Sequence, residues 1–94
     1  MTDVARRVRF VVAGRVQGVG FRAFTRRAAD DLGLGGFVRN RADGWVEGEA
    51  EGPPPQVAEF LLRLAQGPAF ASVSRVDTDE LPPTGSGRGF DVRR

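Results

Sequence analysis

A glycine-rich segment that ends in an arginine, Gly14 to Arg22, is the first feature of this sequence that could carry out chemistry. Glycines allow the backbone to curl so that amide hydrogens point inward, and a helix that begins there adds about half a positive charge. Such a nest suits an anion, and an arginine in the first helical turn can make a forked contact with phosphate oxygens. A tight turn followed by a solvated arginine would use the same residues, so spacing alone leaves both interpretations open. If the segment binds a phosphate, the residues that form the binding loop are Arg15, Val16, Gln17, Gly18, Val19, Gly20 and Phe21.

Asn40 is the second candidate, because it is a polar side chain near the end of an otherwise apolar strand face. Its carboxamide can donate and accept hydrogen bonds at once, which is what orienting a water molecule requires. An asparagine just before Asp43 and Gly44 could instead satisfy backbone groups of a turn. From the residues alone, both interpretations stay open.

The types of side chain that are missing narrow the chemistry, because the chain contains no His, Cys, Lys or Tyr. No side chain with an ordinary pKa therefore titrates between roughly pH 5 and 12, and the formal net charge of +2 persists across that range. Disulfides, thiolate nucleophiles, zinc clusters and the commonest neutral-pH base are excluded. Any reaction must rely on Arg, Asp, Glu, amides, hydroxyls or the substrate itself, and we predict no metal and no cofactor.

The length of 94 residues suits one compact domain, which we predict to span residues 1–94. No apolar run approaches the ~20 residues that cross a bilayer, and the N-terminal stretch has no convincing cleavage site. We therefore predict a cytoplasmic protein without a membrane segment. A monomer is the simpler expectation, because no exposed apolar seam is evident.

The elements that would position Arg22 and Asn40 follow from the spacing of apolar residues. Alternation over 7–13 predicts a strand that ends at Gly14, and a helical stripe after the glycine loop predicts a helix that ends at Gly33. The stripe consists of Phe21, Phe24, Thr25, Ala28 and Leu32. The candidate arginine thus lies at the start of the first helix.

Residues 36–41 and 45–52 are predicted to form two strands about a turn. A two-residue turn would place acidic residues on the apolar face of this hairpin. A three-residue loop with a left-handed Gly44 keeps the apolar residues together, and it sets Arg41 beside Trp45 on the outer face. We therefore predict the three-residue loop. Its pairs are Asn40 with Val46, Val38 with Gly48, Arg39 with Glu47 and Arg41 with Trp45.

The second half of the chain repeats the pattern of helix and strand. An apolar spacing of i, i+3, i+4 and i+7 over 57–64 predicts a proline-led helix that stops at Gly67. Residues 72–81 are strand-like, with a bulge expected because Val73 and Val76 break the alternation. Phe90 and Val92 suggest a short closing strand.

The order of these elements indicates an α+β fold of the ferredoxin-like, split βαβ type, a βαββαβ sandwich with two helices on one face of an antiparallel sheet. Right-handed crossovers make the first two strands parallel, with the third between them. Their carboxyl ends then lie at the same edge of the sheet, about 10 Å apart. Arg22 and Asn40 should project to that edge.

Two long segments of the chain resemble the signature sequences of the acylphosphatase family. Gly14 to Arg22 is similar to the first signature, and Gly36 to Gly52 is similar to the second at matching positions. The resemblance covers essentially the whole chain. It implies an enzyme that hydrolyses acyl phosphates to carboxylate and inorganic phosphate by in-line attack of water, without metal or phosphoenzyme. It also implies that Arg22 binds the phosphate and that Asn40 orients the water.

Other functions are compatible with this fold. A non-catalytic module that binds RNA or a small anionic ligand is the main alternative. RNA binding favours aromatic residues on the central strands, but the central strands of this chain carry acids and arginines at their outward positions. We predict no nucleic-acid partner. A carbamoyl-phosphate module, such as the one in a hydrogenase-maturation protein, is a third interpretation.

Two further features are predicted to be structural. The acidic row of Glu47, Glu49 and Glu51 is predicted to form a solvated face paired with Arg39 and its neighbours, rather than a metal site. Trp45 is predicted to make a cross-strand contact rather than to form a platform for a ligand.

Overall fold

The structure is a computed structural model that describes residues 4–85 and 88–94, with five strands and two helices in these ranges. The elements are β1 (Arg6–Arg15), α1 (Phe21–Leu32), β2 (Gly35–Asn40), β3 (Val46–Gly52), α2 (Pro54–Gln66), β4 (Ser72–Leu81) and β5 (Phe90–Arg93). The predicted order is confirmed, and each boundary lies within a few residues of its expected place. Within the described part of the chain, neither helix is long and apolar enough to cross a membrane.

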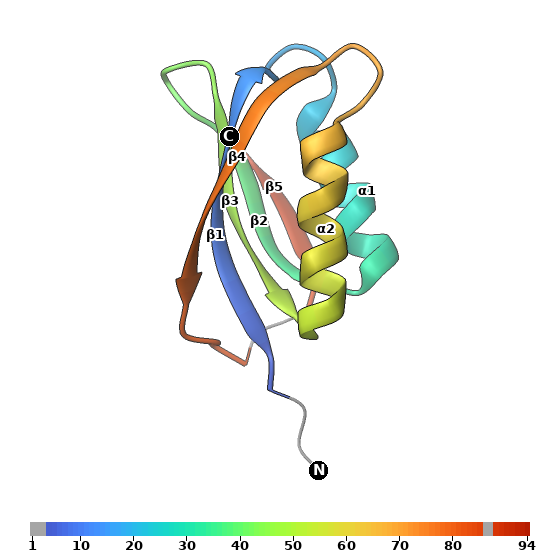
Figure 1. Ribbon diagram of the computed structural model, residues 1–94, viewed down its shortest axis with the longest axis vertical. Helices are drawn as coiled ribbons and strands as arrows, with labels where there is room; N and C mark the ends of the chain where they lie inside the picture. The colour runs from blue at the N-terminus through green and yellow to red at the C-terminus, as the bar shows by residue number, and fades with distance from the viewer. Residues whose placement is uncertain (1–3, 86–87) are drawn as a thin grey trace.

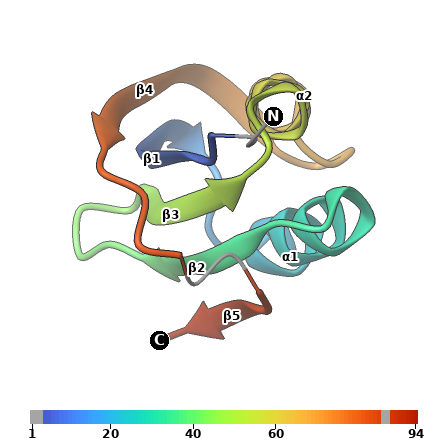
Figure 2. The ribbon, with the colours of Figure 1, turned by 90° about the horizontal axis from the view of Figure 1, so that it is seen from below.

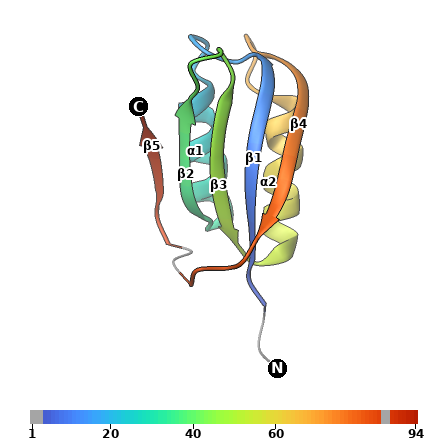
Figure 3. The ribbon, with the colours of Figure 1, turned by 90° about the vertical axis from the view of Figure 1, so that its left-hand side faces the viewer.

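The strands form one sheet in the order β4-β1-β3-β2-β5. Both helices cover one face of it, and the other face is open (Figures 1, 2 and 3). The first four strands in this order pair antiparallel, as predicted, but β5 runs parallel to β2, so the sheet is mixed. The parallel pairing of β5 follows from the direction of β4. Because β4 runs opposite to β2, it ends at the end of the sheet where β2 begins, and β5 starts from there.

The central strand order brings the ends of β1 and β2 together. Both strands pair antiparallel with β3, which lies between them, so they run in the same direction. This confirms the predicted topology. The loop that follows β1 and the residue that ends β2 therefore meet at one edge of the sheet, shown at the top of Figure 1.

The turn between β2 and β3 is the predicted three-residue loop. Asn40 faces Val46 in the ladder, and the Arg41 amide donates a 2.8 Å hydrogen bond to the Trp45 carbonyl oxygen. Gly44 has a positive φ of 94°, as this loop requires. The Arg41 guanidinium lies 5.9 Å from the centre of the Trp45 ring, so the predicted cross-strand contact is also present.

A bulge in β4 explains its irregular apolar pattern. Ala13 pairs with Arg75 and Gly14 with Val73, so β4 carries one extra residue at this point. The extra residue changes which face the following side chains occupy. As a result Val73 and Val76, three positions apart, both pack against the core. The predicted bulge is confirmed.

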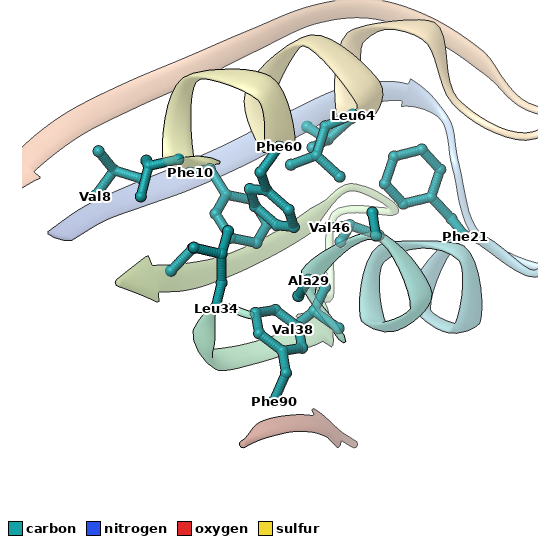
Figure 4. Close-up of a cluster of buried hydrophobic side chains, with 14 of the residues drawn as sticks. Val8, Phe10, Phe21, Ala29, Leu34, Val38, Val46, Phe60, Leu64 and Phe90 are labelled. Atoms are coloured by element: carbon teal, nitrogen blue, oxygen red, sulfur yellow. The ribbon is translucent and has the colours of Figure 1, made fainter. Parts of the chain in front are cut away.

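The core fills the space between the sheet and the helices (Figure 4). Phe60 of α2 is its centre, with its ring 5.5 Å from that of Phe10 in β1 and 5.9 Å from that of Phe90 in β5. All three side chains are buried. Burial of a phenylalanine contributes about 1.5–3 kcal/mol, so these contacts fix α2 and the last strand on the sheet.

The acidic row of β3 is not the solvated face that its spacing predicted. The Glu51 side chain is 1% exposed and that of Glu47 is 13% exposed. Arginines of the neighbouring strand cover them: Arg7 forms ion pairs with Glu49 and Glu51, and Arg9 forms one with Glu47. The expected pairing with arginines is therefore correct, but the prediction of solvent exposure was wrong.

Glu51 also holds the chain that leads to the last strand. Its carboxylate accepts hydrogen bonds from Arg7, from the Thr84 amide and hydroxyl, and from the Gly85 amide, each 2.8–2.9 Å long. Burial alone would raise the pKa of Glu51, but these donors outweigh it and lower the pKa from 4.5 to about 2. We call Arg7, Glu51, Thr84 and Gly85 the Glu51 clamp.

Candidate active site

The loop between β1 and α1 has the backbone conformation that an anion nest requires. Gly18 and Gly20 have positive φ angles of 74° and 76°. A Cβ atom at either position would meet no other atom within 4 Å, so glycine is needed there for its backbone conformation and not for space. The loop therefore turns sharply just before Phe21, where the helix begins.

The first turn of α1 is open to a ligand. Gly20 is its N-cap and supplies no side chain, no side chain caps the helix within the described residues, and the first turn carries no acidic residue. The first amides of a helix have no acceptor within it, and the helix dipole gives this end a partial positive charge. This end of α1 is suited to an anion.

A cavity of roughly 430 Å³ lies beside this helix end. Arg22 and Asn40 both line it, so the structure brings the two predicted residues to one place. The other residues that line it are Val16, Gly18, Gly20, Phe21, Ala23, Arg26, Arg27 and Val92. None of these described lining residues is acidic. We call this cavity, with the residues that line it, the cradle.

The predicted loop residues divide into two groups in the structure. Four of them line the cradle: Val16, Gly18, Gly20 and Phe21. The other three do not line it: Arg15, Gln17 and Val19. Arg15 is exposed in β1, where it pairs with Ser72, and Val19 packs on the core.

Gln17 connects the loop to the hairpin that carries Asn40. Its side-chain amide donates hydrogen bonds to the carbonyl oxygens of Arg41 and Trp45, at 2.7 and 2.9 Å. Arg41 directly follows the end of β2 at Asn40 and Trp45 directly precedes β3, so the two carbonyls lie on either side of the hairpin loop. Gln17 therefore fixes the distance between the two halves of the cradle, which are the glycine loop before Arg22 and the hairpin that carries Asn40. Its side chain does not line the cavity.

Trp45 strengthens the same hairpin from outside. The Arg75 guanidinium lies 5.2 Å from its ring centre, in addition to the Arg41 contact described above. Arg75 belongs to β4, so the ring joins the hairpin loop to the edge of the sheet. These contacts support the structural interpretation of Trp45.

Arg22 is oriented by the last strand, which the sequence did not indicate. Its Nη1 donates a 2.8 Å hydrogen bond to the carbonyl oxygen of Arg93. The guanidinium carries five N–H donors, so this bond leaves others available for a ligand. No sequence signal marks such a contact, because its acceptor is a backbone carbonyl that any residue would supply.

The donors of the cradle suit an oxyanion and not a cation. Within residues 4–85 and 88–94, no group of three or more His, Cys, Asp or Glu side chains is arranged to hold a metal ion. Guanidinium groups and helix amides surround the cavity, with one carboxamide at its side. Such a set can bind a phosphoryl group and orient a neutral molecule next to it.

Fold and cradle together define a class of protein, a small split βαβ domain suited to receive an anion at one edge of its sheet. Within that class the chain belongs to the acylphosphatase family, whose family model matches residues 8–92. Members of this family hydrolyse acyl phosphates, and the chain is accordingly a hydrolase.

Individual relatives agree with this assignment. The acylphosphatase of Synechococcus sp. WH7803 is 50% identical over 98% of this chain and 91% of its own length. The crystal structure of the Bacillus subtilis acylphosphatase superimposes with a TM-score of 0.90 at 37% identity and covers 95% of this chain and 99% of that one. HypF from T. kodakarensis, at 33% identity and a TM-score of 0.82, matches 95% of this chain with 12% of its own. The same architecture thus also occurs as a small part of a longer chain.

Proposed function

We propose that this enzyme cleaves the carboxyl-phosphate bond of acyl phosphates by direct, metal-independent attack of water, with Arg22 binding the phosphate and Asn40 orienting the water. The observation that carries this proposal is that Arg22 and Asn40 line one cavity at the open end of α1. The substrate is a small molecule, and the products are a carboxylate and inorganic phosphate.

Phosphate binding is assigned to Arg22 and the amides around it. The bond from Arg22 to the Arg93 carbonyl holds the guanidinium in place before the substrate arrives. Its remaining N–H groups would bind two phosphate oxygens, and the amides of the loop and of the first helical turn would bind others. Because these donors are fixed in advance, they stabilise the charge that the equatorial oxygens carry in the transition state.

Water activation is assigned to Asn40. A carboxylate is a weakly basic leaving group and needs no strong acid behind it, so the reaction mainly requires a water molecule in line with the bond that breaks. The carboxamide of Asn40 would accept a hydrogen bond from this water and donate one to the phosphate. The water oxygen then bonds to phosphorus as the bond from phosphorus to the acyl oxygen breaks.

Removal of the water proton is assigned to the substrate. None of the described residues lining the cradle is acidic, and the chain has no histidine. We propose that a phosphate oxygen takes the proton from the water and that the carboxylate leaves with the bonding electron pair. A rate controlled by an enzyme carboxylate, and abolished by replacing one Asp or Glu, would contradict this step.

We further propose that the enzyme acts as a cytoplasmic monomer without a nucleic-acid partner. The arginines of the open sheet face support the last point, because Arg7, Arg9 and Arg39 are each paired with an acid of β3. Sedimentation of the purified chain, with and without RNA, would test both the oligomeric state and the partner.

The decisive experiment for the activity is a hydrolysis assay on benzoyl phosphate beside p-nitrophenyl phosphate, a phosphate monoester, in the presence of a chelator. The proposal predicts turnover of the anhydride alone, undiminished by the chelator. No turnover of benzoyl phosphate would favour a module that only binds an anion. Turnover that needs an added metal would overturn the metal-independent mechanism.

A further inference from the structure

The cradle contains more positive charge than one phosphoryl group requires. Arg22, Arg26 and Arg27 all line it, and none of the other described lining residues is charged. The proposed mechanism uses Arg22 alone. The two further arginines are therefore a feature of the cavity that the reaction leaves unexplained.

The position of these arginines along α1 separates them from the phosphate site. Four residues of helix rise about 6 Å, so Arg26 stands one turn beyond Arg22 on the same side of the helix. Arg27 follows it and lines the same cavity. Ala23 and Val92 also line the cavity, and Ala23 has a small side chain that leaves room along the helix. A ligand whose phosphate sits at Arg22 can extend its other end along this path.

The guanidinium groups of Arg26 and Arg27 form few ion pairs with the described residues of the protein. Among the described residues, Arg26 forms an ion pair with Asp30 alone, at 3.6 Å, and both side chains are more than half exposed. Arg27 has no ion pair with any residue that the structure describes. By contrast, Arg7 and Arg39 of the open face each contact a carboxylate of β3 at hydrogen-bonding distance. Exposed ion pairs contribute little, so Arg26 remains available to a ligand.

We propose that Arg26 and Arg27 form a second anion subsite, which favours acyl phosphates whose acyl group carries a further carboxylate or phosphate. This rests on the proposed function, because it takes the phosphoryl group to be bound at Arg22. The acyl chain would contact Ala23 and Val92, and its charged end would face Arg26 and Arg27. The two arginines determine specificity and take no part in bond breaking.

The test compares two rigid substrates of equal size, 4-carboxybenzoyl phosphate and its neutral counterpart 4-carbamoylbenzoyl phosphate. We expect the enzyme to prefer the charged substrate in kcat/KM by about two- to fivefold for each arginine, the range of exposed charge pairs. Raising the salt from about 10 mM to about 0.5 M should reduce this preference, because the Debye length falls from about 30 Å to a few ångströms.

Variants assign the preference to residues. The double variant Arg26→Gln/Arg27→Gln should bring the ratio of the two kcat/KM values close to one. Asp30→Asn should raise the ratio, because it frees Arg26 from its ion pair. Arg6→Gln is the control for charge alone: it removes one positive charge, where the double variant removes two, at the start of β1 far from the cradle, where Arg6 is paired with Glu80. It should leave the ratio unchanged.

The outcomes separate this inference from the function on which it rests. Equal turnover of both substrates by the unmodified enzyme, or a preference that the double variant retains, would overturn the subsite and leave the acylphosphatase activity intact. An equal loss of preference in Arg6→Gln would assign it to the net charge of the molecule and also overturn the subsite. If neither substrate were hydrolysed, the proposed function itself would fail.

Discussion

The two ends of the sheet use the same kinds of side chain in opposite ways. At one end, the Glu51 clamp joins Arg7 to Glu51, and the carboxylate also accepts hydrogen bonds from Thr84 and Gly85. At the other end, Arg22 donates to one backbone carbonyl, and the cradle around it contains no acidic residue among those described. In the clamp the charged groups are paired with one another, whereas the described residues of the cradle supply more hydrogen-bond donors than acceptors.

This difference indicates where a ligand can bind. A buried charge must be paired, since an unpaired one costs several kcal/mol, and no buried side-chain nitrogen or oxygen of the described residues lacks a hydrogen-bond partner. Arginine is abundant all over this chain, so positive charge alone does not mark a site. What marks the cradle is a cavity where guanidinium groups and an uncapped helix end meet, with no acidic residue among the described residues that line it. Substitutions at the two ends should accordingly affect different properties.

The largest effect on activity is expected for Arg22→Ala. Removal of a fixed electrostatic donor typically costs ~10²–10³ in rate, and we expect at least this loss in kcat/KM, mostly through a higher KM. Arg22→Lys keeps the positive charge but lacks the planar guanidinium that can bind two phosphate oxygens at once, so it should recover only part of the loss. Steady-state kinetics on benzoyl phosphate measures both. If the alanine variant stayed folded and kept its activity, Arg22 would have no role in binding phosphate.

Asn40→Ala should affect turnover more than binding. Loss of the group that orients the water should lower kcat by about 10²-fold, as misplacement of a reactant does, with little change in KM. The inhibition constant of inorganic phosphate should stay close to that of the unmodified enzyme. If the inhibition constant of phosphate rose as much in Asn40→Ala as in Arg22→Ala, both residues would bind phosphate. That result would contradict the assignment of phosphate binding to Arg22 and water orientation to Asn40.

At the other end of the sheet, Glu51→Gln should affect stability and not chemistry. The folded state holds the pKa of Glu51 near 2, below its ordinary value of 4.5, so the contribution of Glu51 is present above pH 5 and lost as the pH falls toward 2. The substitution should lower the free energy of unfolding at neutral pH by on the order of 2 kcal/mol and make its decline in acid shallower.

Denaturant unfolding at a series of pH values measures this effect, with kcat on benzoyl phosphate recorded beside it. Glu80→Gln is the matched control, since Glu80 is an exposed carboxylate paired with Arg6 near the same end of the sheet. Its effect should be much smaller. If Glu51→Gln and Glu80→Gln behaved alike, the clamp would not stabilise the fold in the way described.

Of the three substitutions at the cradle end of the sheet, Gln17→Ala should lower activity least, and it tests how the glycine loop is linked to the hairpin that carries Asn40. It removes two hydrogen bonds to the hairpin, each worth about 1 kcal/mol, and should lower kcat by about tenfold. Gln17 is a positioning residue that acts through Asn40. The double variant Gln17→Ala/Asn40→Ala should therefore be little worse than Asn40→Ala alone. Full additivity of the two losses would show that Gln17 acts independently.

Most of the fold could be predicted from the sequence because the signals are local. Apolar spacing defined the helices, and the need to keep the apolar residues of two neighbouring strands on one face, away from the acids, selected the three-residue loop that places Asn40 opposite Val46. Strand order then followed from general rules of chain crossing. The meeting of Arg22 and Asn40 at one edge is a consequence of that topology.

The features that could not be predicted are long-range and use backbone groups. The Arg22–Arg93 contact joins residues 71 positions apart, and the acceptor is a carbonyl oxygen. Glu51 is bound by backbone and side-chain donors of the loop after β4, 33 and 34 positions away. In the sequence, three acids at alternate positions look equivalent. Only the path of the loop over the sheet buries Glu51 and leaves Glu49 more exposed.

Titration of the ¹⁵N-labelled protein with inorganic phosphate, followed by NMR, tests most directly that the donors of the cradle are the binding site. We predict shifts of the amide signals from Gly18 to Ala23 and of the side-chain signals of Arg22 and Asn40, while those of the Glu51 clamp stay in place. Shifts centred on the arginines of the open sheet face, with the cradle unperturbed, would contradict the account.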